Sequence, residues 1–242
     1  MRHNVDTYLV TGASSGIGYA VAVALLERGH RVMGLGRDQA RLNIAHPAFR
    51  PVSCNLADLD ALPERLAALH SELSRIKGVV LCAGAGRFGS LEEFSYAQIR
   101  ELVDLNVTAQ MYLARTVLPT FKARGAGDLI LIGSQAALAG GRRGTVYTAT
   151  KFAIRGFCQA LRQEASASGV RVALINPGMV DTAFFDELDF APGESPENHL
   201  RADDVAAAVC AVLDMPPGTV VDEINLSPLK KVIRRKPRPD TL

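Results

Sequence analysis

The 242-residue sequence contains no tryptophan, few cysteines and no long apolar run. Its four cysteines, Cys54, Cys82, Cys158 and Cys210, are scattered without a Cys-x-x-Cys pair, so we expect reduced core residues of a cytoplasmic protein. The five histidines lack the spacing of metal ligands, and we expect no metal. No apolar run approaches the ~18 residues of a membrane span, and the first residues form no apolar signal segment. We therefore expect neither membrane insertion nor secretion.

The chain also carries little net charge, +2 at pH 7, and its basic excess belongs to one segment. Residues 230–238 hold six of the 27 basic residues, which leaves 21 basic against 24 acidic residues before position 230. We predict a single domain over residues 1–229 and a basic tail, residues 230–242, that is disordered or docked on the surface. Contact with a neighbouring subunit is the alternative for the tail, and we expect no nucleic-acid or membrane partner.

A glycine-rich turn is the first positive feature of the sequence. The apolar run Tyr8–Val10 leads into Thr11-Gly-Ala-Ser-Ser-Gly-Ile-Gly18, and a helical pattern follows over residues 19–28. Strand, glycine-rich turn and helix together are typical of a dinucleotide site, where glycines allow a close approach to the pyrophosphate at the helix N-terminus. The alternative is a plain turn rich in small residues. A P-loop is excluded because no Gly-Lys-Ser/Thr follows.

The end of the second predicted strand, Arg31–Leu35, bears on the choice of cofactor. It is followed by Gly36-Arg37-Asp38, with no acidic residue at the strand end. A carboxylate there would bind a ribose 2′-hydroxyl, whereas an arginine accepts a 2′-phosphate. The sequence thus favours NADP(H), with NAD(H) still possible. Asp38 is expected to cap a helix over residues 39–42.

Strands continue to alternate with helices along the rest of the chain. This alternation predicts an α/β fold with a doubly wound parallel sheet covered by helices on both faces. Residues 179–201 show no periodicity and are predicted to form a mobile lid. The further strands are expected at 49–53, 78–82, 128–133, 170–175 and 219–226, and the further helices at 57–76, at 95–118 (one or two, with local irregularity at Asn106) and at 202–213.

Tyr147 and Lys151 are spaced to share one face of a helix, one turn apart. A cation about 4 Å from the phenol would lower its pKa from ~10 toward ~7, which would make Tyr147 a working acid and base. Ser134 follows an apolar run at a strand end, where α/β proteins place polar groups over a ligand crevice. A Tyr-x-x-x-Lys motif alone also occurs by chance. Asn106 has the alternative of a buried asparagine that bonds only to neighbouring backbone.

Five motifs stand in order: Thr11-Gly-x-x-x-Gly-x-Gly18, Asn106, Ser134, Tyr147-x-x-x-Lys151 and Pro177-Gly178. In this order and spacing the sequence resembles the short-chain dehydrogenase/reductase family, from about residue 7 to residue 228. The resemblance implies one Rossmann domain with a seven-stranded parallel sheet. It also implies hydride transfer between a nicotinamide and a carbonyl or secondary alcohol of a small molecule.

Site residues follow from the same resemblance. It implies Tyr147 as acid and base, Lys151 as its electrostatic partner, Ser134 as a donor to the substrate oxygen, and Asn106 as the residue that fixes a proton-relay water. It implies cofactor contacts, in addition to Arg37, Tyr147 and Lys151, from Gly12, Ser14, Ser15, Ile17, Gly18, Asn55, Leu56, Ala83, Gly84, Pro177, Val180 and Thr182. The chain departs from the family where Leu81-Cys-Ala-Gly84 replaces the common Asn-Asn-Ala-Gly, and where Asn55 replaces a common aspartate.

The substrate is the least determined part of the prediction. We expect substrate contacts from Gln135, Arg142 and Phe184. Arg142 and Arg143 could meet a carboxylate, with a solvated loop or a subunit contact as the alternative. The leading hypothesis is an NADP-dependent oxidoreductase that forms a homodimer or homotetramer. The second is a catalytically silent dinucleotide-binding sensor or scaffold.

Overall fold

The computed structural model describes residues 5–236, and its centre is a seven-stranded sheet in the order β3-β2-β1-β4-β5-β6-β8. All six neighbouring strand pairs are parallel, as predicted. The strands are β1 (Thr7–Thr11), β2 (Arg31–Gly36), β3 (Phe49–Ser53), β4 (Gly78–Leu81), β5 (Gly127–Ile132), β6 (Val170–Pro177) and β8 (Glu223–Leu226).

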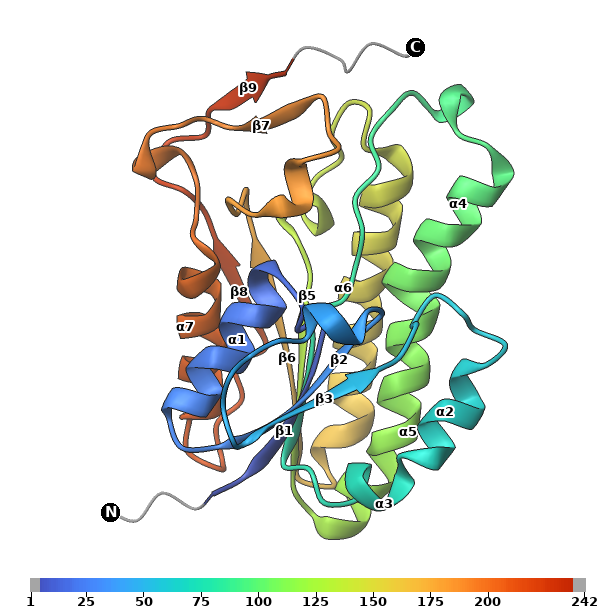
Figure 1. Cartoon of the computed structure of the whole chain (residues 1–242), viewed down its shortest axis with the longest axis vertical. Coiled ribbons are helices and arrows are strands. Elements are labelled where there is room, and N and C mark those ends of the chain that lie inside the picture. The colour runs from blue at the N-terminus through green and yellow to red at the C-terminus, as the bar shows by residue number, and fades with distance from the viewer. Residues whose placement is uncertain (1–4, 237–242) are drawn as a thin grey trace.

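Helices cover both faces of this sheet, as Figure 1 shows. One face is covered by α1 (Gly16–Glu27) and α7 (Ala202–Leu213), the other by α2 (Leu62–Ala68), α3 (His70–Leu73), α4 (Tyr96–Val103), α5 (Ala109–Arg124) and α6 (Thr145–Ser166). The central strand β5 shows the consequence: Leu129 and Leu131 enter the core on one face, whereas Ile130 enters the core on the other. A strand buried on both faces therefore reads as a continuous apolar run.

Two predicted elements differ in the structure. The single helix expected at 57–76 is two short helices, α2 and α3, separated at Leu69. Pro63 lies in the first turn of α2, the position where a helix tolerates proline, so α2 begins at Leu62. The last strand was expected from Thr219, but its pairing with β6 begins only at Glu223.

The expected irregularity at Asn106 is confirmed. Residues Asp104–Thr108 form a π-helical turn between α4 and α5, and Asn106 lies buried inside it. Such turns displace the following helix by one residue and are frequent at functional sites. Here the turn sets the direction in which the Asn106 amide points.

The predicted lid and the basic tail meet each other beyond the carboxyl-terminal edge of the sheet (Figure 1). Within residues 179–201, β7 (Phe190–Pro192) pairs antiparallel with β9 (Ile233–Arg235) of the tail. The tail was expected to be disordered or docked on the surface. Its described part, residues 230–236, is docked. The last residues of the predicted tail, 237–242, lie outside the described residues. No helix in residues 5–236 is long and apolar enough to span a membrane.

Candidate active site

Tyr147 and Lys151 lie on the same face of α6, as predicted, and both are 8% exposed. The Lys151 ammonium lies 5.7 Å from the centroid of the Tyr147 ring. It donates a hydrogen bond of 3.2 Å to the carbonyl oxygen of Ile132, at the end of β5. The pair is thus fixed over the carboxyl end of the sheet, where α/β folds place their ligand sites.

The expected pKa of Tyr147, near 7, is wrong for the protein as the structure has it. Burial raises the pKa of Tyr147 to about 12, an effect that a hydrogen bond from Ser134 only partly offsets. Burial likewise lowers the pKa of Lys151 to about 8. Removing water from both groups disfavours their charged forms, and this cost exceeds the attraction that the helical spacing suggested. At neutral pH Tyr147 is a phenol.

Ser134 begins the loop after β5 and faces Tyr147. Its backbone is extended, and its Oγ accepts a 3.1 Å hydrogen bond from the Ala136 amide at the start of a 3₁₀ turn. The Ser134 side chain interacts with the Tyr147 hydroxyl, which lowers the pKa of Tyr147 and so opposes the effect of burial. Two predicted residues that are 13 positions apart in sequence therefore form one polar centre.

Asn106 connects this centre to the turn after β4. Its side-chain oxygen accepts from the Ala85 amide at 2.9 Å, and its side-chain nitrogen donates to the Ala85 carbonyl at 2.9 Å. The nitrogen also donates to Thr150 Oγ1 at 3.2 Å, beside Lys151 on α6. Asn106 therefore bonds to a side chain of α6 as well as to backbone. The alternative, a buried asparagine that bonds only to neighbouring backbone, is wrong.

The glycine-rich turn is built for close backbone contact. Gly12 has φ of 67°, in the left-handed region that favours glycine. A side chain at Gly18 would overlap the carbonyl oxygen of Gly12, so the start of α1 can pack onto the turn only with glycine there. Thr182, predicted to contact the cofactor, lies against this turn, because a Cβ at Gly16 would be 3.4 Å from its methyl group.

Other predicted cofactor residues line the same edge of the sheet. Arg37 is exposed after β2, and Asp38 caps the following 3₁₀ turn as expected. Asn55 uses its side-chain oxygen to accept from the Ala57 amide at 3.2 Å, whereas the Leu56 side chain is buried in the core. A side chain at Gly84 would lie 3.1 Å from the Asn106 oxygen and 3.8 Å from the Lys151 nitrogen. The remaining predicted contacts are at Ser14, Ser15 and Ile17 in the first turn, at Ala83 after β4, and at Pro177 and Val180 after β6.

Aromatic rings enclose the phenol on its other side. The ring centroids of Phe88 and Phe184 lie 5.0 Å and 6.1 Å from that of Tyr147. Phe184 in turn packs so closely on Gly86 that a side chain there would overlap its ring. Phe185 and Phe190 continue the cluster at 5.2 Å from Phe184 and 5.0 Å from Phe88, respectively. The predicted substrate residue Phe184 thus lies beside Tyr147.

The other predicted substrate residues are placed differently. Gln135 uses its side-chain amide to donate to the Leu226 carbonyl at 2.8 Å and to the Ser227 hydroxyl, which ties it to the end of β8. Arg142 is exposed on the loop before α6. Its neighbour Arg143 pairs with Asp189 at 3.3 Å and with Glu93 at 3.7 Å. These two acidic partners within the chain argue against a role of Arg143 in binding a substrate carboxylate.

Three polar residues were missed as parts of the site. Thr11 Oγ1 accepts from the amides of Cys82 and Ala83, both at 3.0 Å, and so joins the ends of β1 and β4. Gln110 donates to the Ala83 carbonyl at 2.7 Å, and Thr150 donates to the Tyr147 carbonyl at 2.7 Å. All three are buried polar residues, and a polar residue within an apolar stretch of sequence is the signal that could have found them. Within residues 5–236 no group of three or more His, Cys, Asp or Glu could hold a metal ion.

Comparison with known proteins gives one consistent relationship. The profile of the short chain dehydrogenases matches residues 6–191. An uncharacterised oxidoreductase of Staphylococcus epidermidis is 32% identical over 225 residues, which cover 91% of this chain and 96% of that protein.

Solved structures agree in fold. An alcohol dehydrogenase of Thermococcus sibiricus, complexed with 5-hydroxy-NADP, has a TM-score of 0.85 at 27% identity over 95% of this chain and 99% of its own. A serine dehydrogenase complexed with NADP⁺ has a TM-score of 0.80 at 29% identity over 91% and 94%, respectively. The site described above lies on a fold that binds nicotinamide dinucleotides in these neighbours.

Proposed function

We propose, since this chain belongs to the short-chain dehydrogenase family, that it is an NADP(H)-dependent oxidoreductase that reduces the carbonyl group of an apolar small molecule. One observation carries this proposal. Asn106, Ser134 and the pair Tyr147 and Lys151 come from three separate parts of the sequence and lie together at the carboxyl end of the sheet.

Tyr147 is proposed as the proton donor to the carbonyl oxygen. Its pKa of about 12 keeps the phenol protonated at neutral pH, which suits an acid better than a base. The protonation state therefore favours the direction of reduction. The hydroxyl of Ser134, beside the phenol, would donate to the same oxygen as negative charge develops on it.

Lys151 and Asn106 are proposed to support this proton transfer. The Lys151 ammonium is held by the Ile132 carbonyl below the ring, where its positive charge stabilises a tyrosinate after the proton has left. Asn106, bonded to Thr150 on α6, holds the Ala85 turn against the Lys151 helix. These bonds fix the position of Lys151 relative to Asn106, whose proposed role is to hold the water that returns a proton to Lys151.

A dinucleotide would be held along the carboxyl edge of β1, β2 and β4. The turn from Gly12 to Gly18 offers backbone amides to a diphosphate, and Gly84 adds no side chain beside Asn106 and Lys151. When bound, NADPH supplies the hydride. Arg37 is proposed to bind its 2′-phosphate. A carboxylate at the end of β2 would instead bind the ribose 2′-hydroxyl of NAD, and the strand ends in Gly36 without one.

The enclosure of Tyr147 supports an apolar substrate. Phe88 and Phe184 surround the phenol with ring faces and edges. Arg143, which contacts residues 179–201 through Asp189, already has two carboxylate partners and offers little attraction to an acidic substrate. We infer a ketone or aldehyde with an aromatic or branched aliphatic substituent and no charge near the carbonyl.

The test is a panel of neutral aryl ketones, aliphatic aldehydes and α-keto acids mixed with NADPH. The proposal predicts oxidation of NADPH, seen as loss of its fluorescence, with neutral apolar carbonyls ahead of the acids. Tight NADPH binding without oxidation by any of these compounds would instead support a sensor or scaffold.

A further inference from the structure

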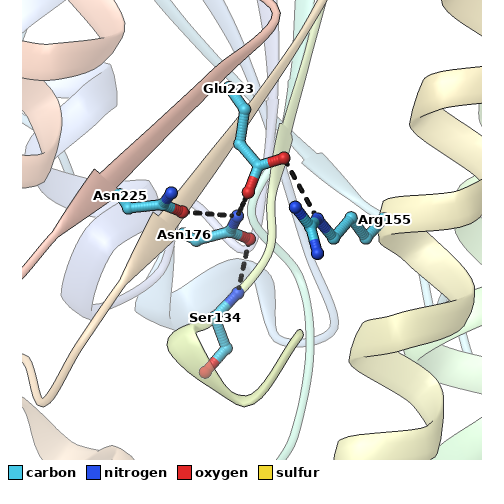
Figure 2. A network of polar contacts seen from close by, with 5 residues as sticks. All are labelled: Ser134, Arg155, Asn176, Glu223 and Asn225. Atoms are coloured by element: carbon cyan, nitrogen blue, oxygen red, sulfur yellow. Dashed lines mark hydrogen bonds and ion pairs between the residues drawn. The ribbon is translucent and has the colours of Figure 1, made fainter. Parts of the chain in front are cut away.

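The deeply buried side chain of Asn176, near the end of β6, is bonded on both sides (Figure 2). Asn176 is 0% exposed. Its oxygen accepts a 3.1 Å hydrogen bond from the backbone amide of Ser134. Its nitrogen donates to Glu223 at 2.8 Å and to Asn225 at 3.0 Å, both on β8. Both polar atoms of this side chain are therefore used.

The loop after β5 is shaped to receive this asparagine. A side chain at Gly133 would overlap the Asn176 oxygen, so the glycine leaves the space that the amide fills. The next residue, Ser134, then turns its extended backbone toward Asn176 and its hydroxyl toward Tyr147. Asn176 thus contacts the backbone of the residue whose side chain faces the phenol.

Glu223 decides which way the amide of Asn176 points. A carboxylate only accepts hydrogen bonds, so it selects the donating nitrogen and leaves the oxygen for Ser134. The other oxygen of Glu223 accepts from Arg155 Nε at 3.0 Å. Arg155 lies one helical turn after Lys151 on α6, so the same contact anchors the helix that carries Tyr147.

We propose that Asn176, Glu223 and Arg155 are positioning residues that set the Ser134 hydroxyl relative to Tyr147. This inference rests on the proposed function, because it assigns Ser134 a place in that reaction. The chain of contacts joins β5, β6, β8 and α6, so a change at Glu223 is transmitted to Ser134 through one rotatable amide. The groups themselves do not touch the reacting atoms.

The inference is tested by moving the negative charge from Glu223 to position 176, in two steps. In Asn176→Asp alone, the new carboxylate faces that of Glu223, and the repulsion should displace Ser134. Adding Glu223→Gln restores the bonding pattern: the aspartate accepts from Ser134 and from the glutamine nitrogen, and the glutamine oxygen accepts from Arg155. Glu223→Gln alone keeps the volume but removes the fixed preference for the amide nitrogen.

The matched control is Asp222→Asn. Asp222 pairs with Arg162 at 2.9 Å, an ion pair between the same helix and the residue next to Glu223, but without a contact to Ser134. Glu223 is more buried than Asp222, so a purely structural role predicts that a change at position 223 lowers stability more, without a specific loss of kcat or faster exchange at Ser134. A positioning role predicts an effect at position 223 only.

We expect Asn176→Asp to lower kcat on the order of 100-fold, the loss that follows displacement of a reacting group by about 1 Å. Glu223→Gln should lower kcat less, about 10-fold, because it introduces no repulsion and displaces Ser134 by a smaller distance. The double variant should recover most of the loss, and Asp222→Asn should match wild type. The Kd for NADPH, from its fluorescence, should stay unchanged throughout.

Amide hydrogen exchange at Ser134, measured by NMR, gives a readout that does not depend on turnover. Exchange should be faster in Asn176→Asp and Glu223→Gln, and should return toward wild type in the double variant. An active wild type whose variants all keep its kcat and its Ser134 exchange would overturn the positioning role. A wild type that binds NADPH but reduces no carbonyl would overturn the proposed function itself, which is a different result.

Discussion

At the scale of single residues, the protonation states of Tyr147 and Lys151 depend on burial more than on their mutual charge. Helical spacing predicted their proximity correctly, since spacing is a property of the sequence. The direction of the pKa shift was not predictable, because it depends on how much water the fold removes from each group. Charged Lys151 therefore costs stability.

This cost predicts how stability changes with pH. Lys151 has a pKa of about 8 in the fold and 10.5 when unfolded, so between these values the unfolded chain binds the extra proton. The contribution of Lys151 to stability should therefore rise with pH from about 8 to 10.5, by about 3 kcal/mol at ~1.4 kcal/mol per unit. Cys82 and Cys158, whose pKa values burial raises from 9.0 to about 12, act in the opposite direction above pH 9, and Tyr147 does so above pH 10.

Urea unfolding of the nucleotide-free wild type and of Lys151→Met from pH 7 to pH 10 isolates this contribution. Above pH 8 the stability of the wild type should rise relative to that of Lys151→Met, because only the wild type has the titrating group. Parallel pH curves for the wild type and Lys151→Met would show that Lys151 titrates normally in the fold.

Arg37 makes the cofactor preference testable at one side chain. It is exposed after β2, and removal of a guanidinium that binds a 2′-phosphate should affect only the cofactor that has one. We expect Arg37→Ala to raise the KM for NADPH at least ~10-fold, the factor of about 1.4 kcal/mol, with little change for NADH. Arg31→Ala, at the other end of the same strand and also exposed, is the control. Equal effects of Arg37→Ala on the two cofactors would contradict the assignment.

At the scale of elements, strands were easier to predict than short helices and loops. The third strand and helix α7 have the predicted bounds, because their apolar patterns end where pairing or packing ends. The helix predicted at 57–76 followed an apolar pattern that continues past Leu69, but the helix itself is interrupted at that residue. The contacts of Asn176 were unpredictable, since its partners lie 42 to 49 residues away and only the folded sheet brings them together.

The turn between β1 and α1 offers a test at this scale. Gly18→Ala places a methyl group against the Gly12 carbonyl, which should cost about 1–3 kcal/mol of stability and weaken NADPH binding. Gly156→Ala in α6 adds the same methyl group where nothing lies within 4 Å, and should stabilise the helix by about 0.5–1 kcal/mol. Thermal unfolding and NADPH titration of both variants provide the comparison. A neutral Gly18→Ala would mean that the turn can open.

At the scale of the whole molecule, the basic tail contacts residues 179–201, the predicted lid. Beyond the β7–β9 pairing, Lys230 pairs with Glu197 at 2.6 Å, and Lys236 donates to the Phe185 carbonyl at 2.6 Å. Individually exposed ion pairs contribute little, but here they add to backbone bonds that join two segments far apart in sequence. The tail thus fixes the segment that carries Phe184 and Phe185.

Deletion of residues 230–242 should free the lid. We expect faster chymotrypsin cleavage at the phenylalanines of residues 179–201 and a higher KM for carbonyl substrates. Deletion of residues 237–242 alone keeps β9 and should leave both properties unchanged. If the longer deletion behaves like the shorter one, the tail does not hold the lid.

The most direct test of the account is the rate of NADPH oxidation by Tyr147→Phe with the best carbonyl of the panel. The phenyl ring keeps the packing against Phe88 and Phe184 but cannot donate a proton. We predict that kcat falls by about 100- to 10,000-fold, the range for a lost general acid, while the Kd for NADPH is unchanged. A variant that retains the wild-type kcat would contradict the role of Tyr147 as proton donor.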